Sequence, residues 1–178
     1  MTGAPAAWRG QAHMDIGWGL FVGDAGDGEP HAHHAVQVLF ADTPQWVWTA
    51  TAGRQRYTGL VIGADVEHRL EPTTAPVMLL YVEPHSTPGR QLQHSLNEGL
   101  LALDEEPMRV ARRALGDVPT SAAVAASVAV IVGDEAPSDS LDVRDALMAQ
   151  LIDSLPLTLP DRLTAARLAK QVGLSESR

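Results

Sequence analysis

Between about residues 15 and 83, apolar and polar side chains tend to alternate, and turn-forming residues recur between the apolar runs. Alternation of this kind is typical of strands with one buried face, and it places Trp18, Leu20 and Val22 on the same side of the first strand. Short strands at this spacing favour an all-β sandwich or barrel over βαβ units, so we predict a small jelly-roll barrel that encloses a pocket. The expected strands are residues 15–22, 30–40, 45–50, 54–58, 60–62 and 78–83.

After residue 89 the apolar positions follow the 3.6-residue period of a helix. A stripe of leucines predicts a first helix over residues 92–103, and residues 108–115 predict a second. A third helix, over residues 122–132, is capped by Thr120 or Ser121 and ends at Gly133. Because this helix is apolar nearly all round, we expect it either to lie under the barrel or to pack against another subunit.

The remaining sequence predicts more helix. Residues 135–140 form the clearest linker in the chain, and residues 141–155 have the pattern of an amphipathic helix. The chain is therefore expected to be α+β overall, with a mainly β N-terminal half followed by an α-helical C-terminal half.

Histidines concentrate in the strand expected over residues 30–40. Alternation places His31, His33 and Gln37 on one face and His34 on the other. Imidazoles at positions i and i+2 lie about 6.5 Å apart along a strand, which is close enough to chelate one ion or to hold one polar ligand. His68, which follows a Gly/Asp-rich turn at the start of another strand, is the candidate that completes the site.

This arrangement resembles the two motifs of the cupin barrel. The first motif corresponds to His31-x-His33 with Gln37 four residues later, and the second to the turn that precedes His68. The resemblance implies a cupin-like jelly-roll barrel with a possible divalent metal ion held by these four residues. Gln37 stands where metal-dependent cupins carry Glu, and the second motif lacks its preferred Pro and Gly. A neutral amide is a poorer ligand than a carboxylate, so hydrogen-bonded pocket histidines without an ion remain an equal alternative.

Residues 163–178 resemble a helix-turn-helix, in which Gly173 supplies the turn, Leu174 fills the gap between helices and Ser175 caps the next helix. Together with the cupin-like region and the helices between, the chain resembles the AraC type of bacterial transcription regulator. The implied domains are a barrel over 1–90, a helical connector with possible dimerisation helices over 91–137, and a DNA-binding domain over 138–178, truncated in its recognition helix. This chain alone is therefore expected to lack specific DNA binding.

The regulator resemblance implies a small-molecule or metal effector, a homodimer and no enzymatic activity. The expected effector-binding residues are His31, His33, Gln37, His68, Trp46 and Trp48, although a tryptophan in a small barrel more often packs in the core or at the rim. In an intact parent the expected DNA-binding residues are Arg167, Lys170, Ser175, Ser177 and Arg178. The alternative is a small metal-dependent cupin enzyme of the dioxygenase or isomerase type. An isolated enzyme has no need of residues 163–178, so we favour the regulator.

The composition of the chain limits its possible partners, covalent links and compartment. The 178 residues carry a formal net charge of −9, which restricts contact with nucleic acid to local regions. The absence of cysteine excludes disulfides and zinc–thiolate sites and fits a reducing compartment. The first ten residues lack a signal-peptide pattern, and the longest apolar run, 122–132, is shorter than the roughly 20 residues of a membrane helix. We therefore expect a cytoplasmic protein with no membrane contact.

Overall fold

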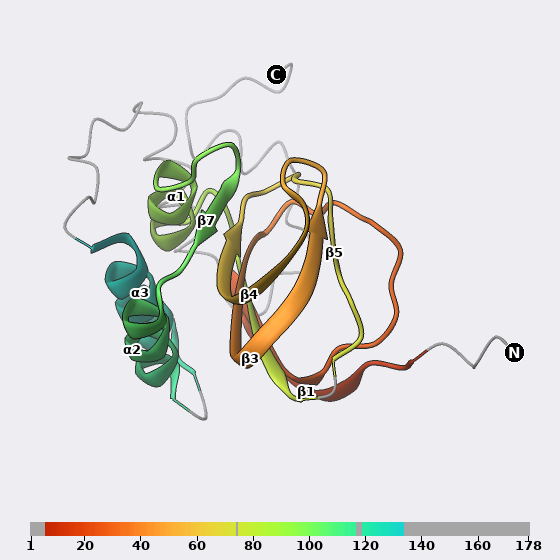
Figure 1. Cartoon of the computed structure of the whole chain (residues 1–178). Helices are drawn as coiled ribbons and strands as arrows, with labels where there is room; N and C mark the ends of the chain where they lie inside the picture. The colour runs from red at the N-terminus through yellow and green to blue at the C-terminus, as the bar shows by residue number, and fades with distance from the viewer. Residues whose placement is uncertain (1–5, 74, 117–118, 134–178) are drawn as a thin grey trace, which may run out of the picture.

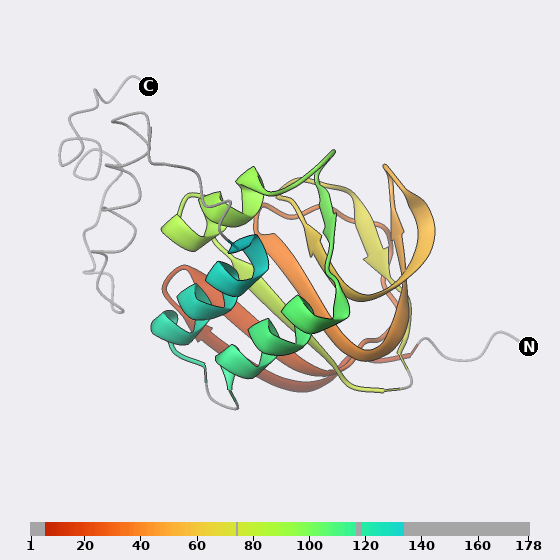
Figure 2. The same ribbon diagram turned by 60° about the vertical axis from the view of Figure 1, so that its left-hand side comes forward.

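The computed structural model describes residues 6–73, 75–116 and 119–133. Within these ranges seven strands form one antiparallel sheet, and three helices cover one of its faces (Figures 1 and 2). The strands are β1 (Arg9–Asp15), β2 (Trp18–Asp24), β3 (Val36–Thr49), β4 (Gly53–Ile62), β5 (His68–Leu70), β6 (Val77–Val82) and β7 (Leu100–Ala102). The helices are α1 (Thr87–His94), α2 (Glu105–Leu115) and α3 (Ser121–Val132).

The long strand β3 organises the sheet, whose strand order is β1-β2-β6-β3-β4-β7. The first part of β3 pairs with β6, and its last part pairs with β5 instead, while β4 runs along the other edge. The register between β3 and β4 shifts between Phe40 and Gln45, where Pro44 has no N–H to donate. At this irregularity β3 bends, and the sheet curves around the face that the helices do not cover (Figure 1).

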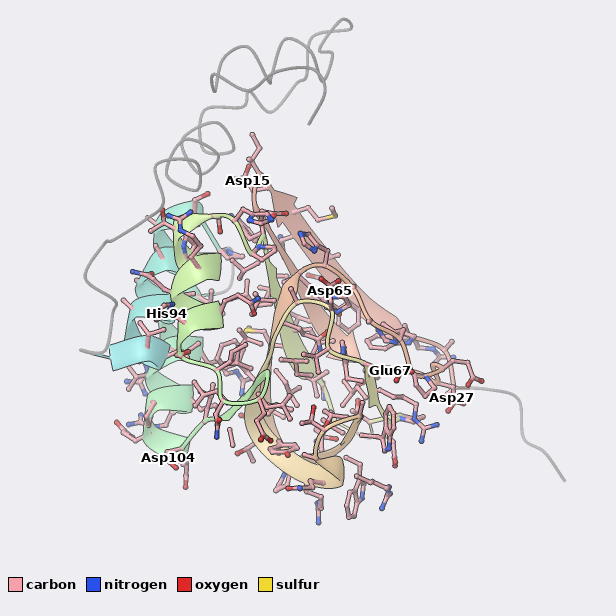
Figure 3. The ribbon with its side chains drawn as sticks, turned by 90° about the horizontal axis from the view of Figure 1, so that it is seen from above. Asp15, Asp27, Asp65, Glu67, His94 and Asp104 are labelled. Carbon is pink, nitrogen blue, oxygen red and sulfur yellow. The ribbon has the colours of Figure 1, made fainter. Side chains whose placement is uncertain are left out.

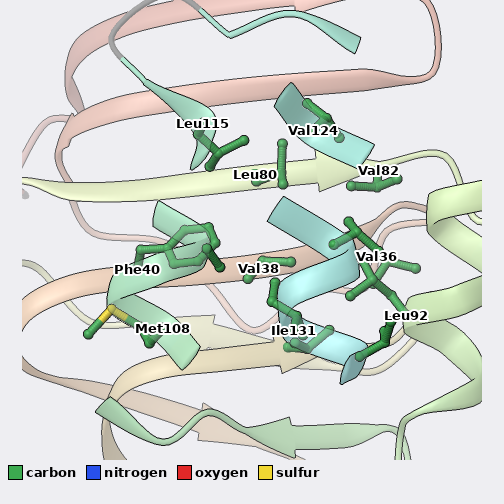
Figure 4. Close-up of a cluster of buried hydrophobic side chains, with 14 of the residues drawn as sticks. Val36, Val38, Phe40, Leu80, Val82, Leu92, Met108, Leu115, Val124 and Ile131 are labelled. Atoms are coloured by element: carbon green, nitrogen blue, oxygen red, sulfur yellow. The ribbon is translucent and has the colours of Figure 1, made fainter. Parts of the chain in front are cut away.

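Alternation along β3 separates two hydrophobic cores. Val36, Val38 and Phe40 face the helices, whereas Leu39 packs into the second cluster on the concave face. The helix-side core contains the buried Leu92 of α1 and residues of every helix and most strands (Figure 4). The residues labelled there are Val36, Val38, Phe40, Leu80, Val82, Leu92, Met108, Leu115, Val124 and Ile131. The helices therefore cover one face of the sheet, and the second cluster packs on the other.

The helix predicted over residues 122–132 is confirmed as α3. The Thr120 side chain accepts a hydrogen bond of 3.2 Å from the Ala123 N–H, and the helix ends at Gly133 with φ of 59°. Val124 and Val128 are buried against the sheet and the other helices, so α3 lies partly under its own sheet.

The predicted fold class, a cupin-like jelly-roll barrel followed by an α-helical C-terminal half, is wrong. Within the described ranges the sheet is open, since its end strands β1 and β7 do not pair. The described helices are short, with 8, 11 and 12 residues. The helix expected over 92–103 ends at His94, and Glu98 and Gly99, which have φ of 50° and 83°, then reverse the chain. Leu100–Ala102 then joins β4 as a seventh strand.

Several strand boundaries also differ from the prediction. The segment expected at 45–50 belongs to the continuous strand β3, and those expected at 54–58 and 60–62 both belong to β4. The predicted first strand is β2, which the unpredicted β1 precedes. The histidine strand begins only at Val36, and His31 contributes an isolated bridge to His68. The predicted linker, the helix at 141–155 and the helix-turn-helix lie outside the described residues. Among the described helices, none has the length and apolar character needed to cross a membrane.

Candidate metal centre

Four of the predicted site residues meet on the concave face of the sheet. The backbones of His31 and His68 exchange two hydrogen bonds, from His31 N–H at 3.0 Å and from His68 N–H at 2.9 Å. His33 follows two residues later, and Gln37 projects from β3 beside Leu39. The ring centroids of the three histidines lie 4.9 to 5.8 Å apart. Bridge and strand together place three imidazoles and one amide around a common point.

Backbone carbonyl groups fix the orientation of all three rings. The Nδ1 atoms of His31, His33 and His68 lie 3.0, 3.0 and 2.8 Å from the carbonyl oxygen of a residue two positions away. A carbonyl oxygen can only accept, so each Nδ1 carries the hydrogen. In the neutral ring Nε2 then keeps its lone pair. Metal-binding histidines typically have this arrangement, with the second nitrogen donating to a carbonyl or carboxylate.

The Gln37 side chain lies against two of these lone pairs. Its Oε1 is 3.0 Å from His33 Nε2 and 3.3 Å from His68 Nε2. Three acceptors this close repel one another unless a cation lies between them or the amide turns its NH₂ group toward the rings. Two ligands that share one ion at about 2.1 Å and subtend 90–110° lie roughly 3.0–3.4 Å apart. One nitrogen of each histidine also lies within 4.8 Å of the other two, so the donor set fits a borderline divalent ion such as Zn²⁺.

Burial keeps one ligand uncharged. The pKa of His68 is lowered from 6.5 to about 4, mainly by desolvation; the hydrogen bond to Val66 opposes this shift, and the nearby His33 and His31 add smaller contributions to it. His68 is therefore neutral at pH 7, as a metal ligand must be. In contrast, His31 is exposed and His33 is half-buried. The site therefore has one buried ligand, His68, and is open to solvent at His31.

A shallow pocket adjoins this cluster. It has a volume of about 400 Å³ and is lined by residues that include Ala35, Phe21 and Tyr81. The Tyr81 ring packs edge-on against His33, with centroids 5.4 Å apart, and burial raises the pKa of its hydroxyl. Tyr81 was not predicted as a site residue. It reaches the cluster because it lies opposite Gln37 in the β3–β6 pairing, which the sequence does not reveal.

The other predicted site residues are not brought to the cluster. Trp46 and Trp48 lie on the face of β3 opposite the buried Val47. Trp46 is 38% exposed, and the Arg54 guanidinium lies 3.7 Å from its ring centroid. Trp46 therefore stacks on an arginine and does not reach the histidine cluster. The predicted DNA-binding residues Arg167, Lys170, Ser175, Ser177 and Arg178 lie outside the described residues.

Comparisons with known proteins find likeness in structure but not in sequence. No protein-family model matches the chain, and no curated protein matches it. The AraC-like transcriptional activator CuxR is 12% identical, with a TM-score of 0.43, over 90% of this chain and 68% of that one. Apo ToxT from Vibrio cholerae strain SCE256 is 8% identical, with a TM-score of 0.44, over 92% of this chain and 73% of that one.

A third solved structure, protein NMB1881 from Neisseria meningitidis, is 21% identical, with a TM-score of 0.36. The match covers 42% of this chain and 84% of that one. All three TM-scores are below 0.5 and all identities are below 25%. We therefore base no functional conclusion on these likenesses.

Proposed function

We propose that this chain is the effector-sensing part of a DNA-binding transcription regulator, and that its signal includes a divalent metal ion held by His31, His33, Gln37 and His68. The observation that carries the metal site is the orientation of the three rings by backbone carbonyls. Because the Nε2 lone pairs already face a common point, little conformational entropy is lost when an ion binds. The regulator role is supported by residues 163–178, whose pattern resembles a helix-turn-helix.

The bound ion would supply a positive charge and would link three segments of the chain, because its ligands come from all three. His31 and His33 lie on a segment that precedes β3, Gln37 belongs to β3, and His68 begins β5. An ion controls a regulator only if it binds one arrangement of such segments better than another. A small-molecule effector in the adjoining 400 Å³ pocket would contact Tyr81, and through it the His33 side of the ion site.

The metal site is tested by measuring bound ions in the purified chain after reconstitution with Zn²⁺, Ni²⁺ or Co²⁺. His33→Ala is expected to remove one tightly bound ion per chain. His94→Ala, which changes an exposed histidine at the end of α1, is the matched control and is expected to bind as the wild type does. Equal ion content in His33→Ala and the wild type would contradict the site.

The regulator role is tested separately, by chromatin immunoprecipitation of the natural protein in its source organism. We expect a limited set of promoter sites whose occupancy changes in the His33→Ala strain. A metal-dependent enzyme is the second candidate, because the exposed His31 leaves the cluster open to solutes. Ion-dependent turnover without enriched DNA sites would favour the enzyme.

We also propose a homodimer. The outward side of α3 exposes only small side chains, including Ala122, Ala125 and Ala126, which allow another backbone to approach closely. Light scattering is expected to give about twice the chain mass of 19.0 kDa. A mass of one chain at micromolar concentration would contradict this part of the proposal.

A further inference from the structure

A second group of side chains that could hold a metal ion lies next to the first, where the start of β3 meets the end of β6. His34, Glu83 and His85 each offer a ligand atom within 4.8 Å of the other two. The topology explains why they meet. Val36 pairs with Val82, so the residues just before β3 and just after β6 emerge side by side. Nothing in the sequence indicates this meeting, because His34 and His85 are 51 positions apart.

Asp65 orients one ligand of this group. Its Oδ2 lies 3.4 Å from His34 Nδ1, so Nδ1–H donates to the carboxylate and Nε2 keeps its lone pair in the neutral ring. Asp65 itself has φ of 60°, and its N–H donates a 2.9 Å hydrogen bond to the His33 carbonyl. Figure 3 shows Asp65 in its loop on the sheet side of the molecule, away from the helices. A carboxylate behind a histidine is a common partner of a metal ligand, because it fixes the ring and raises its basicity.

The start of helix α1 fixes the backbone of the other two ligands. The Glu83 carbonyl accepts hydrogen bonds from Ser86 N–H at 3.0 Å and Ser86 Oγ at 2.6 Å. Ser86 Oγ in turn accepts from Gly89 N–H at 3.2 Å as the helix cap. A Cβ at Gly89 would lie 2.0 Å from the Glu83 carbonyl oxygen, so helix and loop are in close contact. Glu83 is therefore held against the start of α1, and the Arg90 side chain of the same helix donates a hydrogen bond to the His85 carbonyl.

From these contacts we propose that His34, Glu83 and His85 form a second divalent-cation site, with Asp65 as the hydrogen-bond partner of His34. Two imidazoles and one carboxylate suit Zn²⁺, Ni²⁺ or Cu²⁺ and not Mg²⁺ or Ca²⁺, which prefer oxygen ligands throughout. The single carboxylate ligand leaves a charge of +1, which Asp65 offsets. Both histidines are exposed and Glu83 is half-buried, so water completes the coordination and the ion exchanges readily.

This inference goes beyond the proposed function, because the two sites share no ligand. The experiment is calorimetric titration of the full chain with Zn²⁺, and a parallel titration with Co²⁺ followed by visible absorption. The wild type is expected to bind two ions, His85→Ala one, and His33→Ala one. Glu83→Gln, which keeps side-chain size, is expected to lower the affinity of the second ion at least tenfold.

Two further variants sharpen the test. Asp65→Asn removes the charge behind His34 but tolerates the left-handed backbone, and it is expected to weaken the second ion about tenfold. His94→Ala is the control for loss of any exposed histidine, since His94 lies on the helical side of the molecule (Figure 3). Circular dichroism of each variant confirms that it is folded.

Each outcome separates the two sites. If the wild type binds a single ion that His33→Ala removes and His85→Ala does not, the second site is overturned and the first stands. If His85→Ala removes the single ion and His33→Ala does not, the second site stands and the first fails. Binding that none of these variants weakens would be non-specific and would overturn the second site.

Discussion

At the scale of single residues, Gln37 determines the charge of the candidate metal centre. It is 3% exposed, and its side-chain oxygen lies within 3.3 Å of two imidazole nitrogens. With an amide and three neutral rings, a divalent ion keeps its full charge of +2. An anion stabilises a +2 charge in a partly buried site, so an anionic effector on the accessible side would offset the charge that the amide leaves uncompensated.

Replacing this amide by a carboxylate tests the assignment. Gln37→Glu is expected to raise Zn²⁺ affinity by about tenfold or more, because an anionic ligand is added without a change in length. The ion-free variant is expected to be less stable than the wild type, since its buried carboxylate lacks a cation. Competition with a chelator measures the affinity. Gln37→Met is the control that removes the oxygen, and an equal affinity in both variants would show that Gln37 does not bind the ion.

The lowered pKa of His68 predicts how the ion-free protein responds to acid. The unfolded ring binds a proton near pH 6.5, whereas the folded ring does so only at about pH 4. Between these values the unfolded state binds more protons, so a fall in pH destabilises the fold. The free energy of unfolding is not reduced by this effect above pH 6.5. It falls by about 3 kcal/mol in total as the pH is lowered from 6.5 to about 4.

Urea unfolding of the ion-free protein at about pH 7.5 and about pH 4.5 measures this loss. His68→Gln cannot titrate, and its free energy of unfolding is expected to change less between the two pH values. His94→Ala is expected to behave as the wild type does. The prediction fails if His68→Gln and the wild type lose the same free energy.

The sequence was informative about individual residues only where ligands lie close together in the chain. The spacing of His31, His33 and Gln37 pointed to a shared site, and the turn before His68 suggested the fourth member. Tyr81 could not be found in this way, because its position opposite Gln37 depends on how β6 pairs with β3. Trp46 and Trp48 were expected to bind an effector because the fold was predicted to be a barrel with a lined mouth, but both lie on the face of β3 opposite Val47.

At the scale of elements, the turn that leads from α1 into β7 depends on one backbone conformation. Gly99 has φ of 83°, and a Cβ there would lie 2.7 Å from Val66 Cγ2. Gly99→Ala is therefore expected to destabilise the protein by about 2 kcal/mol or more, through left-handed strain and displacement of Val66. Gly53→Ala has φ of 70° with open space around it, so we expect about 1 kcal/mol.

Gly28→Ala completes this series as the neutral control, because the Cβ meets nothing within 4 Å and no left-handed φ is involved. Thermal unfolding of the three variants gives their order of stability. Equal values for Gly99→Ala and Gly53→Ala would show that the contact with Val66 does not matter.

Element boundaries were predictable where a local signal marked them. Thr120 and Gly133 marked the ends of α3 correctly. In contrast, the leucines from 92 to 103 fit a helix by spacing, yet those at 100 and 101 pair with β4. The period alone could not reveal this, because the long-range pairing outweighs local propensity. The break predicted between the strands at 30–40 and 45–50 is likewise an irregularity within the continuous strand β3.

At the scale of the whole molecule, the two faces of the sheet have different roles. The helices pack on one face, as Figure 2 shows, and they contribute about half of the buried residues of the larger core. The other face carries the smaller core and the histidine cluster, which joins the segment before β3 to β5. An ion at this cluster would therefore stabilise the half of the fold that the helices do not support.

This division predicts a large effect of metal on stability. An ion at about 100 times its Kd is expected to stabilise the native state by about 2.7 kcal/mol, because it binds the folded chain only. For a chain of this size that corresponds to a rise in Tm of roughly 5–10 °C. Scanning calorimetry with Zn²⁺ and with a chelator measures the difference. His33→Ala is expected to lose most of the rise and His94→Ala to keep it. A rise that His33→Ala retains in full would mean that the stabilising ion binds elsewhere, because His33 supplies one of the four ligands that join these segments.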